Sequence, residues 1–238
     1  MNFIVDIGNT AIKFSLFENK KMIKFKKTNN FCLNEILDFT KNNQIDKTIF
    51  SSVKKIQKDT NKFISIYNPL TFDNNTPLPI KIKYLTPETL GVDRIANAVA
   101  ASCQYQNKKT LIFDFGTCLT IDIVNGNKEF LGGRISPGLI MRYKSLNYYT
   151  DLLPLCDIID DRIFIGNTTN ASINSGVQEG MISEVDSFID DFRKENKNSN
   201  VIFTGGDCFF FEKAIKNSIF ANPYLQMEGL NEILDYNE

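Results

Sequence analysis

Two short stretches of the chain place an aspartate, a glycine and a threonine directly after an apolar run. The first reads FIVDIGNT from residue 3, and the second reads LIFDFGT from residue 111. Such apolar runs predict strands that are covered on both faces. A glycine lets the backbone turn sharply or approach a ligand closely, and an acidic oxygen beside a hydroxyl suits a metal-bound phosphate. Either stretch taken alone also fits an ordinary turn, so this alternative stays open for a single copy.

The repetition of this plan indicates two related halves. Two strand-end aspartates, Asp6 and Asp114, that face each other across a cleft would hold a nucleotide phosphate and its metal. In both motifs the sequence resembles the actin, Hsp70 and sugar-kinase superfamily. The resemblance implies an α/β fold of two related ribonuclease-H-like halves, the actin-like ATPase fold, with the nucleotide cleft between them. We expect an N-terminal half at residues 1–105, with the first phosphate motif and a substrate loop. A C-terminal half at residues 106–238 would carry the second phosphate motif and an adenosine motif.

The pattern of apolar residues and turn signals places strands and helices in both halves. In the N-terminal half we expect strands at 2–6, 12–17, 22–26, 47–53 and 80–84, helices at 33–40, 59–66 and 93–103, and a loop at 68–79. In the C-terminal half we expect strands at 111–114, 120–124, 129–135 and 201–203, and helices at 139–149, 171–194, 209–215 and 229–234. Each half therefore opens with a three-strand meander, which supports the duplication.

Composition excludes several classes of protein. The 238 residues include 27 Lys and Arg against 28 Asp and Glu, and this balance argues against nucleic-acid or membrane-surface binding through bulk charge. There is no His and no Cys-x-x-Cys, so zinc sites of the usual ligands, Ser-His-Asp triads and Cys-His dyads are excluded. No leader peptide opens the sequence, and no apolar run approaches the roughly 18 residues needed to span a bilayer. We expect a cytoplasmic, soluble protein with free thiols.

Three clusters could do chemistry with a nucleotide and a small substrate. After Asp6, the turn amides with Asn9 and Thr10 can bind phosphate oxygens, and Lys13 can reach a transferred phosphoryl group; an Asx turn with a surface lysine is the structural alternative. The TGGD stretch from residue 204 would let backbone lie against a planar ring, although Gly-Gly is also common in turns.

The third cluster is LGVDR, residues 90–94. Asp93 could take a hydroxyl proton while Arg94 fixes an anionic group, as phosphoryl transfer requires. The structural alternative is a helix cap with a surface ion pair.

Taken together, these stretches resemble type III pantothenate kinases. The matching segments span the chain in order: DIGNTAIK at 6–13, LGVDRIANAVAA at 90–101, DFGTCLTID at 114–122, GGRISPGL at 132–139, IGNTTNASINSG at 165–176, TGGD at 204–207 and GL at 229–230. The resemblance implies ATP-dependent phosphorylation of pantothenate to 4'-phosphopantothenate, the first step of coenzyme A biosynthesis. It also implies a homodimer with the pantothenate pocket near the subunit interface.

The resemblance implies a role for each matching position. Asp93 would be the general base, and Asp114 would bind the monovalent cation, potassium or ammonium, while Asp6 would order Mg²⁺ through water. The ATP-binding residues would be Asp6, Ile7, Gly8, Asn9, Thr10, Ala11, Ile12, Lys13 and Thr117. The pantothenate-binding residues would be Tyr84, Gly91, Val92, Asp93, Arg94 and Thr169, with Gly205 and Gly206 beside adenosine.

Some departures and alternatives remain at this point. Phe115 and Cys118 replace smaller residues and are expected to crowd the second phosphate turn, and a His common near the family's C-terminus is absent. A transcriptional accessory protein of the same fold without catalysis is one alternative. The presence of Asp6, Lys13, Asp93 and Arg94 speaks against it. A small-molecule kinase of the superfamily with another substrate is the second, because fold likeness alone does not fix the substrate.

Overall fold

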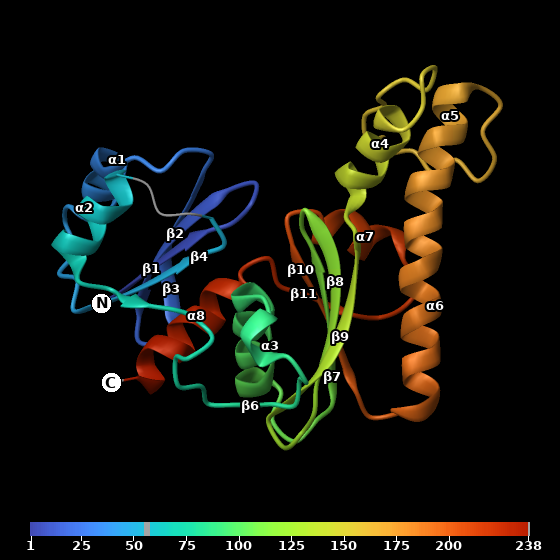
Figure 1. The fold of residues 1–238 in the computed structure, drawn as a ribbon. Helices are drawn as coiled ribbons and strands as arrows, with labels where there is room; N and C mark the ends of the chain where they lie inside the picture. The colour runs from blue at the N-terminus through green and yellow to red at the C-terminus, as the bar shows by residue number, and fades with distance from the viewer. Residues whose placement is uncertain (55–57, 238) are drawn as a thin grey trace. The chain divides into compact units, whose positions relative to one another are not determined.

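The computed structural model describes residues 1–54 and 58–237, and these divide into two compact units. The first unit comprises Met1–Gln106, Asn127–Leu131 and Tyr224–Glu238, and the second comprises Asn107–Gly126 and Gly132–Pro223 (Figure 1). The C-terminal segment of the chain therefore returns to the unit that the N-terminus begins. No helix in the described part of the chain is both long and apolar enough to cross a membrane.

The first unit is built on a mixed sheet with the strand order β3-β2-β1-β4-β5. Its strands are β1 (Asn2–Ile7), β2 (Ile12–Glu18), β3 (Lys21–Thr28), β4 (Lys47–Ser52) and β5 (Leu70–Thr71). β1 is antiparallel to β2 and parallel to β4, so it lies in the middle of the sheet. In this register Asp6 faces Lys13 on one side and Ser51 on the other.

Helices cover both faces of this sheet. α1 (Leu33–Thr40) and α2 (Lys58–Tyr67) cover one face, α8 (Leu225–Tyr236) covers the other, and α3 (Val92–Gln104) packs against α8. The unit also contains a short 3₁₀ turn, η1 (Pro87–Thr89), and β6 (Lys81–Ile82), which pairs with Glu129 and Phe130.

Alternation along β1 decides which residues face which helices. Phe3, Val5 and Ile7 point into an apolar core that includes residues of α1 and α2. The intervening positions face the other side, where Asn2 bonds to side chains of α8. Asp6 shares this second face with Asn2, so the fold directs its carboxyl to the side of the sheet that α8 covers.

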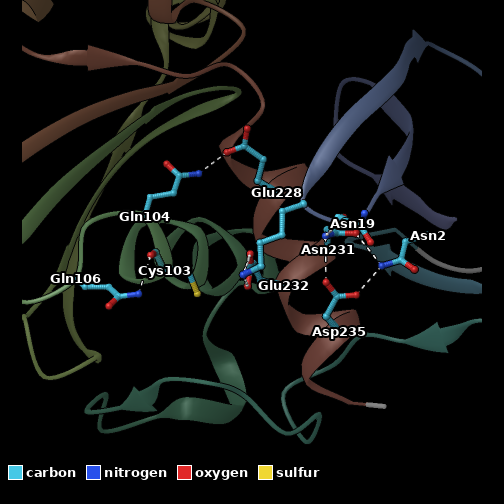
Figure 2. A network of polar contacts seen from close by, with 10 residues as sticks. Asn2, Asn19, Cys103, Gln104, Gln106, Glu228, Asn231, Glu232 and Asp235 are labelled. Carbon is cyan, nitrogen blue, oxygen red and sulfur yellow. Dashed lines mark hydrogen bonds and ion pairs between the residues drawn. The ribbon is translucent and has the colours of Figure 1, made fainter.

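α8 is held in place by close packing and by a polar network (Figure 2). The helix packs against α3, and a Cβ at Gly229 would lie 1.8 Å from the carbonyl oxygen of Ala96, so only glycine permits this approach. Gln104 Nε2 donates to Glu228 at 2.5 Å, and Asn2 Nδ2 donates to Asp235 at 2.6 Å. These contacts fix α8 at both ends.

The second unit repeats the plan of the first. Its sheet contains β11 (Phe220–Ala221), β10 (Asn200–Gly205), β7 (Thr110–Phe115), β8 (Cys118–Val124) and β9 (Glu129–Pro137), in the order β11-β10-β7-β8-β9. β7 is antiparallel to β8 and parallel to β10, as β1 is to β2 and β4. The repeated strand order confirms the predicted α/β fold of two related halves.

In the second unit, three consecutive helical segments, α5 (Thr169–Asn174), the π-helical turn η2 (Ser175–Glu179) and α6 (Gly180–Glu195), form one long helical rod beside the sheet (Figure 1). The unit also contains the helices α4 (Leu139–Tyr148) and α7 (Cys208–Ala214). Residues of α4, α6, α7 and β7 share one apolar core.

Several predicted boundaries were wrong. The expected single helix at 171–194 is interrupted by η2, where the buried Gln178 side chain bonds to the Tyr143 hydroxyl at 2.7 Å. The expected loop at 68–79 contains β5, the expected strand at 80–84 is limited to β6, and β11 was missed. The C-terminal helix begins at Leu225 and not at residue 229. Short edge strands depend on partners distant in the chain, which local pattern does not reveal.

Candidate active site

In the first unit, Asp6 lies at the end of β1 with its carboxyl buried, and 2% of the residue is exposed. Burial raises the pKa of Asp6 to about 6, because the charged form loses its hydration. The charge of Lys13 and then the nearby Ser51 hydroxyl lower this pKa, the charge of Asp93 raises it, and the Gln226 amide lowers it. Asp6 therefore carries a negative charge near neutral pH that its surroundings compensate only in part.

Lys13 occupies β2 directly opposite Asp6. Its ammonium donates a hydrogen bond of 2.7 Å to Oε1 of Gln226, a residue of α8 that is 7% exposed. The alternative of a turn with a surface lysine is therefore wrong, because Lys13 is half-buried and bonded to a buried partner.

The turn after Asp6 exposes Asn9 and Thr10, and the Gly8 N–H donates to the Ala11 carbonyl at 3.0 Å. Ile7, Ala11 and Ile12 are buried. Of the predicted ATP-binding set, these three can therefore offer a ligand only their backbone.

Asp93 is in the first turn of α3, and Gly91 is the N-cap residue. Asp93 Oδ1 accepts the Arg94 N–H at 2.8 Å, and a Cβ at Gly91 would come within 2.5 Å of the same oxygen. The glycine is therefore needed for the carboxyl to fold back over the helix start. Because the charge of Asp93 acts on Asp6, the structure brings the expected base and the expected metal-binding carboxylate into one electrostatic environment.

Arg94 is buried, with 4% exposure, so the alternative of a surface ion pair is also wrong. Its guanidinium carbon lies 5.8 Å from the centre of the Tyr84 ring and 5.6 Å from that of Phe130. Two aromatic faces thus orient the cation. The predicted substrate residues Tyr84 and Arg94 are neighbours, and Val92 begins the same helix.

In the second unit, Asp114 has the position in β7 that Asp6 has in β1. Its register partners are Thr120 and Thr204, so hydroxyl side chains stand where Lys13 and Ser51 stand in the first unit. Gly205 has a φ of 91°, and a Cβ there would lie 2.5 Å from Asp114 Oδ1. Backbone therefore approaches this carboxylate as only glycine allows.

The remaining predicted residues of the second unit occupy loops and helix starts. Thr117 and Gly206 are exposed, and Thr169 is the exposed first residue of α5, next to the N-cap Thr168. The expectation that Phe115 crowds the phosphate turn is wrong. Its ring is buried and stacks on Phe211 with centroids 4.3 Å apart, so it points into the core.

Two residues of the first unit were missed by the sequence analysis. Gln226 lies before the predicted start of the C-terminal helix, and Ser51 is inside a strand to which no role was given. The signal available for Gln226 was its sequence context. Pro223 favours the start of a helix, and Gln226 is a polar residue between the apolar Leu225 and Met227. Ser51 has no local signal, because only strand pairing brings it to Asp6.

The site suits a cation that completes its coordination with phosphate and water. In residues 1–54 and 58–237, no group of three or more acidic, Cys or His side chains could enclose a metal ion. Mg²⁺ commonly uses one or two carboxylates together with substrate phosphates and waters. The buried and incompletely compensated Asp6 carboxyl fits that pattern.

Comparison with known proteins gives consistent matches. The family model "Type III pantothenate kinase" matches residues 2–191. The chain is 41% identical to a type III pantothenate kinase of Christiangramia forsetii over 242 residues, with 100% of this chain and 99% of the relative covered. It is 38% identical to one of Flavobacterium psychrophilum over 241 residues, with 99% of each covered.

Solved structures agree on the fold. A Campylobacter jejuni protein described as a Baf family transcriptional activator has a TM-score of 0.63 at 21% identity, covering 99% of this chain and 98% of that one. The activator of 2-hydroxyisocaproyl-CoA dehydratase from Clostridium difficile, with bound ADPNP, has a TM-score of 0.52 at 12% identity, covering 99% and 93%. The fold is thus that of actin-like ATPases.

Proposed function

The chain belongs to the type III pantothenate kinase family and phosphorylates pantothenate in coenzyme A biosynthesis, and we propose that Asp93 is the general base of this reaction. One observation carries the assignment. Asp93 is fixed at the start of α3 by the Arg94 N–H, and its charge acts on Asp6. A carboxylate whose charge acts on the aspartate proposed to order Mg²⁺ is suited to accept a proton where the phosphoryl group is transferred.

In the proposed mechanism the pantothenate hydroxyl gives its proton to Asp93 while its oxygen attacks the γ-phosphorus of ATP. The new O–P bond forms as the bond to the β-phosphate oxygen breaks, and ADP leaves. Lys13 neutralises charge on the transferred group. Arg94 is oriented by Tyr84 and Phe130 and binds the pantothenate carboxylate.

The other pantothenate contacts are assigned to Gly91, Val92 and Thr169. Gly91 and Val92 form the start of α3, and Thr169 begins α5 with its side chain exposed. These three positions offer backbone groups and one hydroxyl to a small substrate.

The nucleotide is assigned to the two strand-end turns. Residues 6–13 bind its phosphates, Thr117 adds a hydroxyl, and Gly205 and Gly206 provide a flat backbone for adenosine. Asp6 would hold Mg²⁺ through water, and the metal, when bound, would neutralise phosphate charge. The buried Asp6 carboxyl supports this role because a cation would relieve its desolvation.

Asp114 is assigned to a monovalent cation, potassium or ammonium. Its register partners are Thr120 and Thr204, and neither supplies a positive charge. A monovalent cation would offset the repulsion between this carboxylate and the ATP phosphates, using oxygen ligands without a rigid geometry. The expected result is low turnover in sodium buffer and recovery in potassium. Equal rates in the two buffers would remove this role.

We also propose that the protein is a homodimer. Large apolar side chains of α4 and of the connector to α5 are exposed, among them Tyr148 (80%), Leu152 (92%), Phe164 (84%) and Ile165 (78%). Several large apolar side chains exposed within one segment of the chain favour an interaction surface there. Light scattering at assay concentration should give twice the chain mass, and Phe164→Asp should give monomers, whereas Ile66→Asp on α2 should not. A wild-type monomer would contradict the proposal.

The base assignment is tested with Asp93→Asn, which keeps the side-chain shape but removes the proton acceptor. A coupled assay should show kcat lowered by about 10²–10⁴-fold. Glu88→Gln is the matched control, because Glu88 is an exposed carboxylate on η1 with no assigned role. A wild-type rate for Asp93→Asn would exclude Asp93 as the base. Parallel assays with sugars as acceptors test the alternative of a kinase with another substrate. Absence of turnover with every acceptor would favour the non-catalytic protein.

A further inference from the structure

Gln226 is a buried polar residue that lies among the charged groups of the first unit. It is the second residue of α8, and 7% of it is exposed. A buried amide is retained only where both its oxygen and its nitrogen find polar neighbours. The surroundings of Gln226 therefore indicate what it does.

The oxygen of this amide accepts a hydrogen bond from the Lys13 ammonium, with Oε1 and Nζ 2.7 Å apart. The amide also stabilises the charged form of Asp6, so it interacts with both members of the register pair Asp6 and Lys13. Glutamine suits this position better than its relatives. A glutamate would repel Asp6, and an apolar residue would leave the lysine ammonium without this acceptor.

We propose that Gln226 is a positioning residue for phosphoryl transfer, which holds the Lys13 ammonium beside Asp6 in the pose that meets the transferred group. The inference rests on the proposed role of Lys13. A lysine has four rotatable side-chain bonds and loses rotamer freedom when it is held. A fixed acceptor reduces the number of poses that the ammonium samples before the reaction.

The anchoring of α8 makes Gln226 a rigid acceptor. The network of Figure 2 ties α8 to Asn2 at the start of β1 and to Gln104 at the end of α3. Gly229 lets the helix approach Ala96 closely. Gln226 is 213 positions from Lys13 in the sequence. Its helix, α8, is nevertheless bonded through Asp235 to Asn2 of β1, the strand that carries Asp6. Sites on rigid elements hold catalytic geometry better than sites on loops.

The test is a double-mutant cycle with Gln226→Met, Lys13→Met and both changes together. Methionine keeps the length and volume of glutamine, so the packing of α8 should be preserved. We expect Gln226→Met to lower kcat by about 10–100-fold with little change in KM for pantothenate. Because Gln226 acts through Lys13, the double variant should be no slower than Lys13→Met alone. Gln106→Met is the control and should keep the wild-type kcat, because Gln106 is exposed and its amide donates to the Cys103 carbonyl and not to α8.

The outcomes separate the inference from the function on which it rests. Effects of Gln226→Met and Lys13→Met that multiply, or an unchanged kcat in Gln226→Met, would overturn the positioning role alone. An unchanged kcat in Lys13→Met would overturn the proposed role of Lys13 and this inference with it. Thermal unfolding is measured for every variant. If Gln226→Met is unfolded, Gln226→Asn replaces it, because it keeps the amide but is one methylene too short to reach Lys13.

Discussion

The two strand-end aspartates of this protein share a position in the fold but have different surroundings. Asp6 is opposite Lys13 and Ser51, and Asp114 is opposite Thr120 and Thr204. The turn that follows Asp6 is also one residue longer, since Ile7 pairs with Ile12 whereas Phe115 pairs with Leu119. The two motifs share a backbone plan, and the side chains on neighbouring strands give each carboxylate its own environment.

The two surroundings differ in the source of the positive charge near each carboxylate. In the first unit a lysine is part of the sheet, and Gln226 of α8 holds it. In the second unit the equivalent sheet positions carry hydroxyls, and the backbone of Gly205 approaches the carboxylate. The first motif therefore contains its own cation, whereas the proposed role of Asp114 has its carboxylate bind one from solution. This comparison can be tested by changing each motif in turn.

The largest expected effect is on turnover after loss of the first carboxylate. Asp6→Asn should lower kcat by about 10²–10³-fold and raise the Mg²⁺ concentration needed for half-maximal rate, because the proposed role of Asp6 places its charge where Mg²⁺ meets the phosphates. Asp114→Asn should weaken activation by potassium more than it alters the Mg²⁺ dependence. Titration of both cations for both variants measures this. Identical Mg²⁺ and potassium responses in the two variants would show that the aspartates are not specialised.

Loss of the same carboxylate should stabilise the unliganded protein. Burial raises the pKa of Asp6 from 3.8 to about 6, so between these values the folded state binds more protons than the unfolded state, and stability falls as pH rises. Above pH 6 the cost reaches about 3 kcal/mol, taking 1.36 kcal/mol per pKa unit. In Asp6→Asn this cost is absent.

Urea unfolding without nucleotide or Mg²⁺ should therefore show a stability gain in Asp6→Asn that is small near pH 4 and largest above pH 6. The matched control is Asp38→Asn, since the Asp38 side chain is 82% exposed and a surface change has little effect. A gain that is constant across this range would mean that titration of Asp6 does not cause it.

The surroundings of Asp114 should depend on a backbone glycine, Gly205, whereas those of Asp6 depend on side chains. Gly205→Ala places a Cβ 2.5 Å from Asp114 Oδ1 at a φ of 91°, and should lower the free energy of unfolding by about 1–2 kcal/mol. Gly206→Ala is the control, because no atom lies within 4 Å of its added Cβ. Chemical denaturation measures both. Equal stability of the two variants would mean that backbone approach at Asp114 is not constrained.

The repeated motif was enough to predict the duplication and the strand ends that carry both aspartates, because apolar runs and Asp-x-Gly are local signals. Helix α1 was also predicted with its observed bounds, since its apolar spacing is local. The partners of Asp6 could not be found in this way. Ser51 reaches Asp6 only through parallel pairing, and Gln226 reaches Lys13 only because α8 packs back onto the first sheet. The assignment of Asp93 as base stays a prediction until its variant is measured.

The smallest expected effect comes from giving the second motif the lysine of the first. Thr120 occupies the register position opposite Asp114 that Lys13 occupies opposite Asp6, and it is half-buried, so a lysine there can extend toward the carboxylate. A fixed ammonium near Asp114 would replace part of the charge that a monovalent cation supplies. Thr120→Lys should therefore reduce the ratio of rates in potassium and sodium by about tenfold, equivalent to ~1.4 kcal/mol. Thr120→Met adds similar bulk without charge and should keep the wild-type ratio. An unchanged ratio in a folded Thr120→Lys enzyme would mean that the two motifs differ for a reason other than the residue opposite the aspartate.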